Sequence, residues 1–235
     1  MYKDSWAGHW NGQTPAGDPH TRARETIKPT GTTIRVKIPS RKNGRMTRAE
    51  SSLEGDAVFL FEASHHVLRY RDQPPTIYYP DGAKLRRYTP DFELELDTGE
   101  LLTVEVKPTS SLACEKVRHQ LDCIEKHFRA SGVNYLVLTE EVILQEPRLS
   151  NLRKICAGAQ RIWPTADAIQ NALNQHYQHF PTTFQHANEL LQKHNLNVYS
   201  LFVKGALTMD LKSLINPKTT VHITKENDNA HFWIG

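Results

Sequence analysis

Carboxylates gather in one short stretch of the chain, residues 88–108 (YTPDFELELDTGELLTVEVKP). Apolar and polar residues alternate on both sides of its Asp-Thr-Gly, which predicts two antiparallel strands joined by a three-residue turn with Gly99 in the left-handed conformation. The turn fixes the register, and the opposed pairs are Leu96 with Glu100, Leu94 with Leu102, Phe92 with Val104, and Asp91 with Glu105. A one-residue shift would set Phe92 against Glu105, so the hydrophobic pattern supports the same pairing.

Asp91 and Glu105 are therefore expected to face each other, with Cβ atoms about 5 Å apart. Unpaired like charges in that position are destabilising, so a cation should lie between them. Lys107 projects from the same face as Glu105, but one mobile ammonium does not by itself account for two facing carboxylates. Mg²⁺ does, because it binds one or two carboxylates together with water and phosphate oxygens, and Mn²⁺ is expected to substitute.

The order Asp, thirteen residues, Glu, one residue, Lys suits phosphodiester hydrolysis. Asp91 and Glu105 would hold one or two metal ions against the scissile phosphate. Lys107 would orient or deprotonate the attacking water and offset the charge of the pentacovalent state. This is the pattern of the PD-(D/E)xK, restriction-endonuclease-like nucleases.

Sites of this kind usually take a further acid from the helix before the sheet, and Glu54 is the candidate. It borders the apolar stripe of the predicted helix, from which a side chain can reach the sheet. Glu50 is assigned instead to a capping role, and Glu62 to solvent near the end of the helix. An ordinary solvated glutamate remains the alternative for Glu54.

The surrounding pattern predicts the elements that position these residues. Thr47 and Glu50 match a capping box, which starts a helix of about seventeen residues. Short strands, the hairpin, a helix capped by Ser111 and ended by Gly132, and a buried strand follow. This order predicts an α/β fold, a restriction-endonuclease-like core with a mixed sheet flanked by helices, over residues 47–146.

The pattern of predicted secondary structure changes after residue 146. Three helical stretches, near 147–159, 165–178 and 183–194, precede the β-rich segment TTVHIT. Helices followed by a two-stranded ribbon predict a winged-helix-like α+β domain over residues 147–235.

Residues 1–46 are rich in Gly and Pro and predict an arm rather than a domain. Residues 1–50 carry ten Lys or Arg against four acids, so the net charge of +3 divides into +6 there and −3 in the remainder. A basic arm suggests a polyanion such as double-stranded DNA, and a solvated leader is the alternative. The candidate DNA-binding residues of the arm are Lys37, Arg41, Lys42 and Arg45.

The bulk composition gives further expectations. No apolar run approaches a membrane span and no signal peptide is evident, so a cytoplasmic protein without a membrane partner is expected. The three cysteines form no CxxC pair, which indicates neither a disulfide framework nor a zinc site. His176 and His179 lie on one predicted helix, but no further spacing completes a metal site, which favours surface or interface histidines.

Two segments, SSLEGDAVFLFEASHHVLRYRDQPPTIYY and RRYTPDFELELDTGELLTVEVKP, resemble the N-terminal catalytic domain of TnsA-type transposon endonucleases. That family has S-x-L-E, Q-P, T-P-D-F and E-V-K in this order, and the resemblance spans about residues 47–140. It implies Glu54 as the helix carboxylate, Asp91 as the central metal ligand, Glu105 as the next acid and Lys107 as the catalytic lysine. Some members have glutamine in place of Glu105, so direct ligation by Glu105 is the less certain role. Gln73 matches a family glutamine that contacts the DNA backbone or supports the site, and a strand-end residue before Pro74 is the alternative.

The later segment VYSLFVKGALTMDLKSLINPKTTVHIT resembles the end of the family's winged-helix domain, which is associated with binding the AAA+ regulator TnsC. The resemblance implies nicking at the 5′ ends of a bacterial transposon, while a DDE transposase, TnsB, cuts and joins the 3′ ends. Two alternatives stay open. One is a catalytically silent DNA-binding adaptor, and the other is a freestanding restriction or repair nuclease.

Overall fold

The computed structural model describes residues 36–224, which divide into two compact units. The first holds residues 36–61 and 66–143, and the second holds residues 62–65 and 144–224. Residues 1–35 of the predicted arm and residues 225–235 of the predicted C-terminal domain lie outside the described residues. None of the helices in the described part is both long and apolar enough to cross a membrane.

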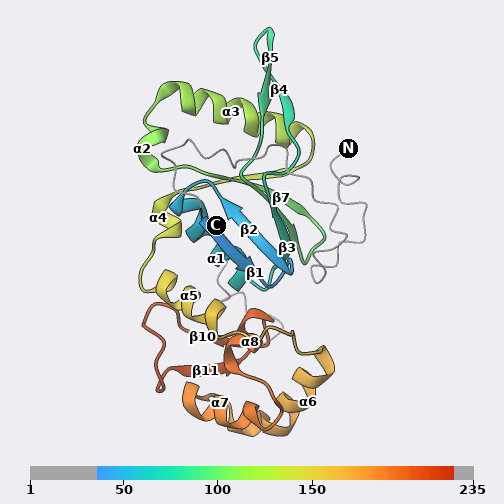
Figure 1. Cartoon of the computed structure of the whole chain (residues 1–235), viewed down its shortest axis with the longest axis vertical. Helices are drawn as coiled ribbons and strands as arrows, with labels where there is room; N and C mark the ends of the chain where they lie inside the picture. Colours follow the sequence, from blue (N-terminus) through green and yellow to red (C-terminus); the bar gives the residue numbers. More distant parts are fainter. Residues whose placement is uncertain (1–35, 225–235) are drawn as a thin grey trace. The chain divides into compact units, whose positions relative to one another are not determined.

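A four-stranded mixed sheet forms the centre of the first unit (Figure 1). Its spatial order is β3 (Val67–Asp72), β6 (Phe92–Leu96), β7 (Leu101–Val106) and β8 (Asn134–Leu138). β3, β6 and β7 are antiparallel neighbours, and β8 runs parallel to β7. The predicted mixed sheet flanked by helices is therefore present.

The β6–β7 hairpin has the register predicted from the sequence. Phe92 lies opposite Val104 and Leu94 opposite Leu102. Gly99 has a φ of +80°, which a left-handed turn residue requires. The even-numbered side chains of β6 thus lie on one face, and Asp91, Glu93, Glu95 and Asp97 alternate with them.

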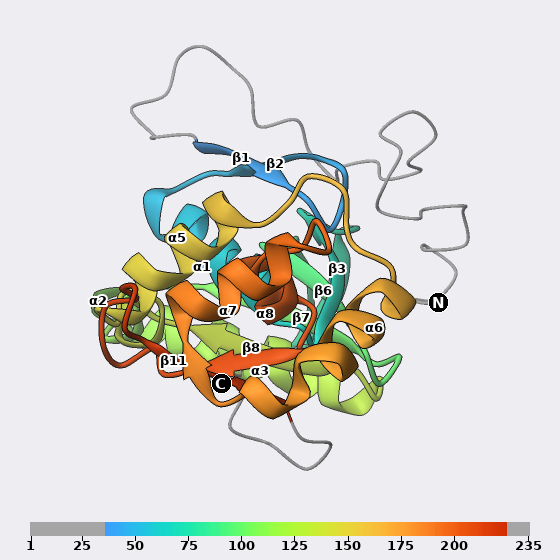
Figure 2. The ribbon, with the colours of Figure 1, turned by 90° about the horizontal axis from the view of Figure 1, so that it is seen from below.

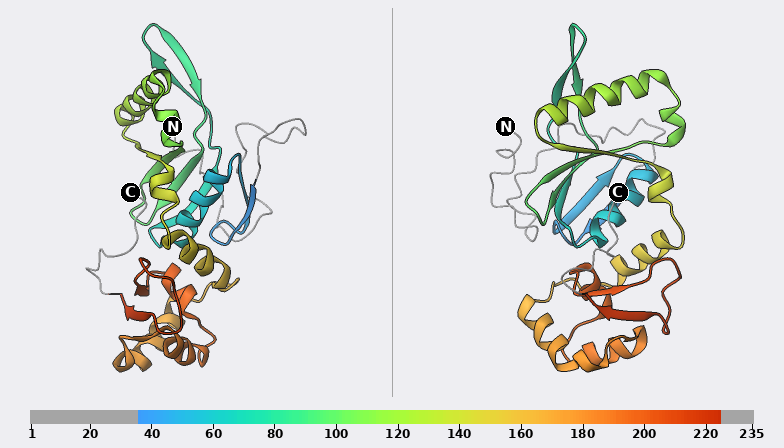
Figure 3. Two further views of the ribbon diagram at one scale, coloured as in Figure 1. Left: turned by 90° about the vertical axis from the view of Figure 1, so that its left-hand side faces the viewer. Right: turned by 180° about the vertical axis from the view of Figure 1, so that it is seen from behind.

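Helices cover the two faces of this sheet (Figure 3). They are α1 (Ser52–Ala63), α2 (Thr109–Leu112), α3 (Glu115–Ala130) and α4 (Glu140–Ile143). On one face Phe61 of α1 packs edge-on against Phe92, with ring centroids 5.1 Å apart. On the other face Phe128 of α3 stacks on Tyr135 of β8, at 5.2 Å. The acidic face of β6 is the one that α3 covers, because Tyr135 is paired with Thr103, which is itself paired with Glu93.

The segment before α1 differs from its prediction. β1 (Val36–Ser40) and β2 (Arg45–Ala49) form a hairpin, so residues 36–46 are not an unstructured arm. Thr47 is buried within β2 and cannot cap a helix. The helix begins four residues later, because Ser51 Oγ accepts a hydrogen bond from the Glu54 amide at 3.1 Å.

The helix predicted to begin at Ser111 is broken into two. Ser111 lies within the single turn of α2, and Cys114 is the residue that precedes α3. The other end is as predicted, because Gly132 has a φ of +67° immediately beyond the helix.

A third hairpin extends beyond the sheet beside α3 (Figure 1). β4 (Ile77–Asp81) pairs with β5 (Lys84–Tyr88), and Gly82 turns between them with a φ of +60°. The hydroxyl groups of Thr76 and Thr89 are hydrogen-bonded at 2.7 Å where the two strands leave the core. We call residues 77–88 the β4–β5 ribbon.

The second unit combines short helices with a three-stranded sheet of order β10-β11-β9. Its main elements are α5 (Arg148–Gly158), α6 (Ala166–His176), β9 (Thr182–Thr183), α7 (Phe184–Gln192), α8 (Val198–Val203), β10 (Leu207–Met209) and β11 (Thr220–Ile223). Three helices were predicted here, near their observed positions, whereas α8 was not. α8 lies against both α5 and α7 (Figure 2).

Candidate active site

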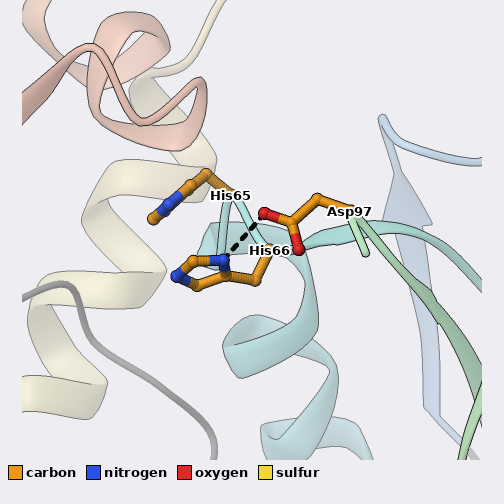
Figure 4. A group of neighbouring side chains, drawn as sticks. All are labelled: His65, His66 and Asp97. Carbon is orange, nitrogen blue, oxygen red and sulfur yellow. Dashed lines mark hydrogen bonds and ion pairs between the residues drawn. The ribbon is translucent and has the colours of Figure 1, made fainter. Parts of the chain in front are cut away.

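Three of the four carboxylates that alternate along β6 are paired with basic side chains from β3 and the residue before it. The pairs are Glu93 with Arg71 (2.5 Å), Glu95 with Arg69, and Asp97 with His66 (2.8 Å; Figure 4). Arginines of β3 therefore neutralise Glu93 and Glu95 within the sheet, and Asp97 has a histidine as its partner.

Asp91 is the exception in this row. The residue next to it on the β3 side is Gln73, whose backbone amide donates to the Asp91 carbonyl at 2.8 Å. An amide side chain brings no positive charge to this position. The Oδ2 atom of Asp91 accepts a hydrogen bond from the Val106 amide at 2.9 Å, which fixes the carboxylate against β7.

Glu105 and Lys107 complete this end of the sheet. Glu105 is buried, and its Oε1 atom forms an ion pair with Lys107 Nζ at 2.6 Å. Its Oε2 atom accepts a hydrogen bond from the Tyr88 hydroxyl at the end of the β4–β5 ribbon. The predicted grouping of Asp91, Glu105 and Lys107 is thus present in the structure.

The charges at this end of the sheet act on one another. Burial, and then the Glu105 carboxylate, hold the pKa of Asp91 well above its usual value, while Lys107 opposes the rise. Glu54 also raises the pKa of Asp91, so its charge reaches the same region. Burial alone would lower the pKa of Lys107, but Glu105 and Asp91 raise it overall and keep the side chain an ammonium.

Glu54 is held at the first turn of α1. Its Oε2 atom accepts from the Glu50 amide at 2.7 Å, and its Oε1 atom accepts from the Ser51 hydroxyl at 3.0 Å. Burial first, and also the Glu50 carboxylate, raise the pKa of Glu54, whereas Lys107 lowers it. Glu54 therefore caps its own helix and belongs electrostatically to the site, and direct metal ligation would require it to release these bonds.

Two glutamates differ from their predicted surroundings. Glu50 was assigned to helix capping by its side chain, but its Oε1 atom accepts from Gln73 Nε2 at 2.7 Å, beside Glu54. Glu62 was expected in solvent, and it is buried. Sequence reasoning missed Glu50 as a member of the site because its place in the S/T-x-x-E pattern had already explained it.

Gln73 is a buried residue with an unusual backbone, with a φ of +48°. Its Nε2 atom binds Glu50, and its buried Oε1 atom has no hydrogen-bond partner among residues 36–224. Gln73 follows the end of β3, as the strand-end alternative has it, and of its two proposed functional roles the geometry favours support of the site over contact with a DNA backbone.

The basic residues predicted to track DNA have mixed surroundings on the β1–β2 hairpin. Lys37 is exposed and Arg41 is half-buried. Lys42 Nζ donates to the Val67 carbonyl, and Arg45 forms an ion pair with the buried Asp72 at 3.1 Å. Lys42 and Arg45 thus fasten the hairpin to β3, which corrects the expectation that they point at phosphates.

The donor set at the β6–β7 end suits a hard divalent cation. Asp91, Glu105 and Glu54 bring three carboxyl groups to the same region, against the single ammonium of Lys107. The Oδ1 atom of Asp91 accepts no hydrogen bond from the described part of the chain, and it is available as a ligand. Oxygen donors of this kind, with waters, are what Mg²⁺ binds in phosphoryl-transfer sites.

Comparison with protein families identifies this part of the chain. Residues 64–140 match the family described as TnsA-like endonuclease N terminal. The match includes Gln73, Asp91, Glu105 and Lys107 but begins after Glu54. No curated protein matches the chain. Residues 64–140, which hold the sheet, the β4–β5 ribbon and α3, are thus similar to the TnsA-like endonuclease N-terminal family.

Proposed function

We propose that this protein is a Mg²⁺-dependent DNA endonuclease that nicks the 5′ ends of a transposon. The observation that carries the proposal is Asp91, the one carboxylate in the β6 row that faces Glu105 instead of a basic partner. Two buried carboxylates close together destabilise the fold by their repulsion. Such a pair is expected where a metal ion and a phosphate will be bound.

The side chains divide the work between them. Asp91 and Glu105 would hold Mg²⁺, with Glu54 as the third acid, and Mg²⁺ when bound polarises the scissile phosphate. Lys107, kept protonated by its neighbours, would donate to the attacking water or to a phosphate oxygen and offset the charge that develops there. Its raised pKa favours this role over deprotonation of the water. Tyr88 and Val106 hold Glu105 and Asp91 in place.

The wider assignment rests on the family match. We infer a subunit of a TnsA/TnsB-type transposase that works on DNA in the bacterial cytoplasm, with a TnsB-type DDE transposase as partner. The second unit, taken as a winged-helix-like domain, would bind a TnsC-type AAA+ regulator. Lys37 and Arg41 remain candidates for phosphate contacts, because their side chains are at least partly exposed.

The test is strand cleavage by the complex reconstituted with its partner transposase and transposon-end DNA. Asp91→Ala should abolish 5′ cleavage and leave assembly intact, whereas the matched variant Glu95→Ala should cleave like the wild type. Cleavage retained in Asp91→Ala would refute the nuclease assignment. An adaptor would show no metal-dependent stabilisation that Asp91→Ala removes, and a freestanding nuclease would cleave without any partner.

A further inference from the structure

A cluster of metal-ligating side chains joins the β4–β5 ribbon to α3. Asp81 ends β4, and His119 and Cys123 lie one turn apart on α3. The Asp81 Oδ1 atom lies 2.8 Å from His119 Nε2, and Cys123 Sγ lies 3.7 Å from the same nitrogen. One donor atom from each of the three residues lies within 4.8 Å of the other two.

The geometry of this cluster differs from that of a nucleophilic relay. In a Cys–His–acid relay the thiol and the carboxylate contact opposite nitrogens of the imidazole ring. Here Asp81 and Cys123 both face Nε2 of His119, so an oxygen, a nitrogen and a sulfur converge on one region of space. Convergence of such donors is the arrangement that binds a metal ion.

The distances suit zinc. Tetrahedral zinc, with bonds of about 2.0–2.1 Å to nitrogen and about 2.3 Å to sulfur, places these two ligand atoms about 3.6 Å apart. The contact between His119 and Cys123 is 3.7 Å. Bonds of about 2.0–2.2 Å to oxygen would place Asp81 and His119 atoms about 3.3 Å apart, a lengthening of about 0.5 Å from the present contact.

The surroundings of Asp81 favour its ligand form. Arg86 Nε donates to the Oδ2 atom at 3.0 Å, which leaves Oδ1 toward His119. Arg86 thus neutralises one oxygen without covering the other.

We propose that Asp81, His119 and Cys123 form a zinc site with one coordination position open to water or an anion. Asp81 and His119 line a pocket of about 660 Å³, and its other charged residues are Arg86, Arg87, Lys116 and Glu115. Three basic side chains against one acid would favour an anion in the open position. Spacing along the chain does not reveal this site, because Asp81 lies 38 residues before His119.

Zinc at this position would tie the β4–β5 ribbon to α3. The ribbon leads directly to the proposed catalytic residues, since Tyr88 at its end binds Glu105 and Asp91 follows three residues later. The zinc site would thus fix a strand that positions the nuclease centre. It does not depend on the nuclease proposal, because its ligands are separate residues.

Cobalt titration of the full-length protein, freed of metal by chelation, tests the site directly. Co²⁺ should give one equivalent of thiolate-to-cobalt charge-transfer absorption, and added Zn²⁺ should displace it. Cys123→Ser should abolish the absorption, and His119→Gln should weaken binding by more than about tenfold. Cys114→Ser removes an exposed thiol outside the cluster and should leave the absorption unchanged.

Circular dichroism of each variant would show that the fold is kept. Absorption that persists in Cys123→Ser, that is lost equally in Cys114→Ser, or that never forms would overturn the zinc site. None of these outcomes alters the cleavage test of Asp91, so failure of one proposal can be told from failure of the other.

Discussion

Two neighbouring positions on the acidic face of β6 have similar residues and opposite electrostatics. At one position Glu93 is fully buried and forms an ion pair with Arg71 at 2.5 Å. At the other, two residues earlier on the same face, Asp91 lies beside Gln73 and near Glu105, and its pKa is raised. The comparison teaches that a carboxylate on this strand stabilises the fold or serves chemistry according to its neighbour on the β3 side.

Loss of the Lys107 ammonium, which opposes the raised pKa of Asp91, should have the largest effect of these changes. Lys107→Met should reduce 5′ strand cleavage by about 10²–10³-fold, because a positioned donor to developing negative charge is removed. Single-turnover cleavage in the reconstituted complex measures this. Lys126→Met, on the exposed surface of α3, is the control and should cleave normally. Equal loss in both variants would remove the catalytic assignment of Lys107.

Breaking the ion pair between Glu93 and Arg71 should instead lower the free energy of unfolding. Glu93→Gln leaves the buried Arg71 without its carboxylate, and loss of one partner of a buried ion pair costs about 3–5 kcal/mol. Urea unfolding followed by circular dichroism measures the free energy of unfolding. A loss of free energy of unfolding below about 1 kcal/mol would show that Glu93 does not stabilise the fold in the way that distinguishes it from Asp91.

Removing the charge of Asp91 should have the opposite effect on the free energy of unfolding. The pKa of Asp91 is higher in the folded chain than in the unfolded one, so the folded state binds the extra proton. Without divalent metal, stability from this group is therefore fully present below about pH 4 and is lost as pH rises through the folded pKa.

Asp91→Asn should remove that slope and raise metal-free stability at pH 7 by on the order of 1 kcal/mol. Unfolding curves between about pH 4 and about pH 8 measure both the slope and the stability at pH 7. Mg²⁺ should restore the stability of the wild type at pH 7 and not that of the variant. A variant less stable than the wild type at pH 7 without metal would contradict the electrostatic account.

The smallest effect is expected where the pairing is more exposed. Glu95→Gln breaks the ion pair between Glu95 and Arg69. The exposed fraction of these two side chains is one fifth to one quarter. Such pairs contribute at most about 1 kcal/mol, so unfolding should shift little and cleavage should not change. A loss of cleavage in Glu95→Gln would mean that the catalytic region extends further along β6 than Asp91.

Local signals were enough to predict the hairpin and the grouping of Asp91 with Glu105. The turn at Gly99 and the alternation around it are properties of a few neighbouring residues. The partners of Glu93 and Glu95 were not predicted. Their pairing depends on the register between β3 and β6, which shifts between Val67 and Arg69.

The start of α1 shows where pattern reasoning fails. Thr47-x-x-Glu50 and Ser51-x-x-Glu54 both match a capping box, and only the second is used. The choice depends on β1 pairing with β2 and packing on the helix, where a Cβ placed on Gly55 would lie 3.4 Å from Val36. Contacts between distant segments decided the helix boundary, and with it the surroundings of Glu50.

The second unit gives a similar lesson. Val198–Val203 is rich in β-branched and aromatic residues, which are typical of strands. It nevertheless forms α8, because the Asn197 side chain accepts a hydrogen bond from the Ser200 amide at 2.8 Å and caps the helix. The Asn197 cap is a local signal present in the sequence, and the composition of the segment points the other way.

A crystal soaked in Mn²⁺ tests the central claim most directly. The account predicts an anomalous difference peak bound by carboxylate oxygens of Asp91 and Glu105, close to Lys107, and no such peak in crystals of Asp91→Asn. A peak that persists without Asp91, or a metal bound instead at Glu93 or Glu95, would contradict it.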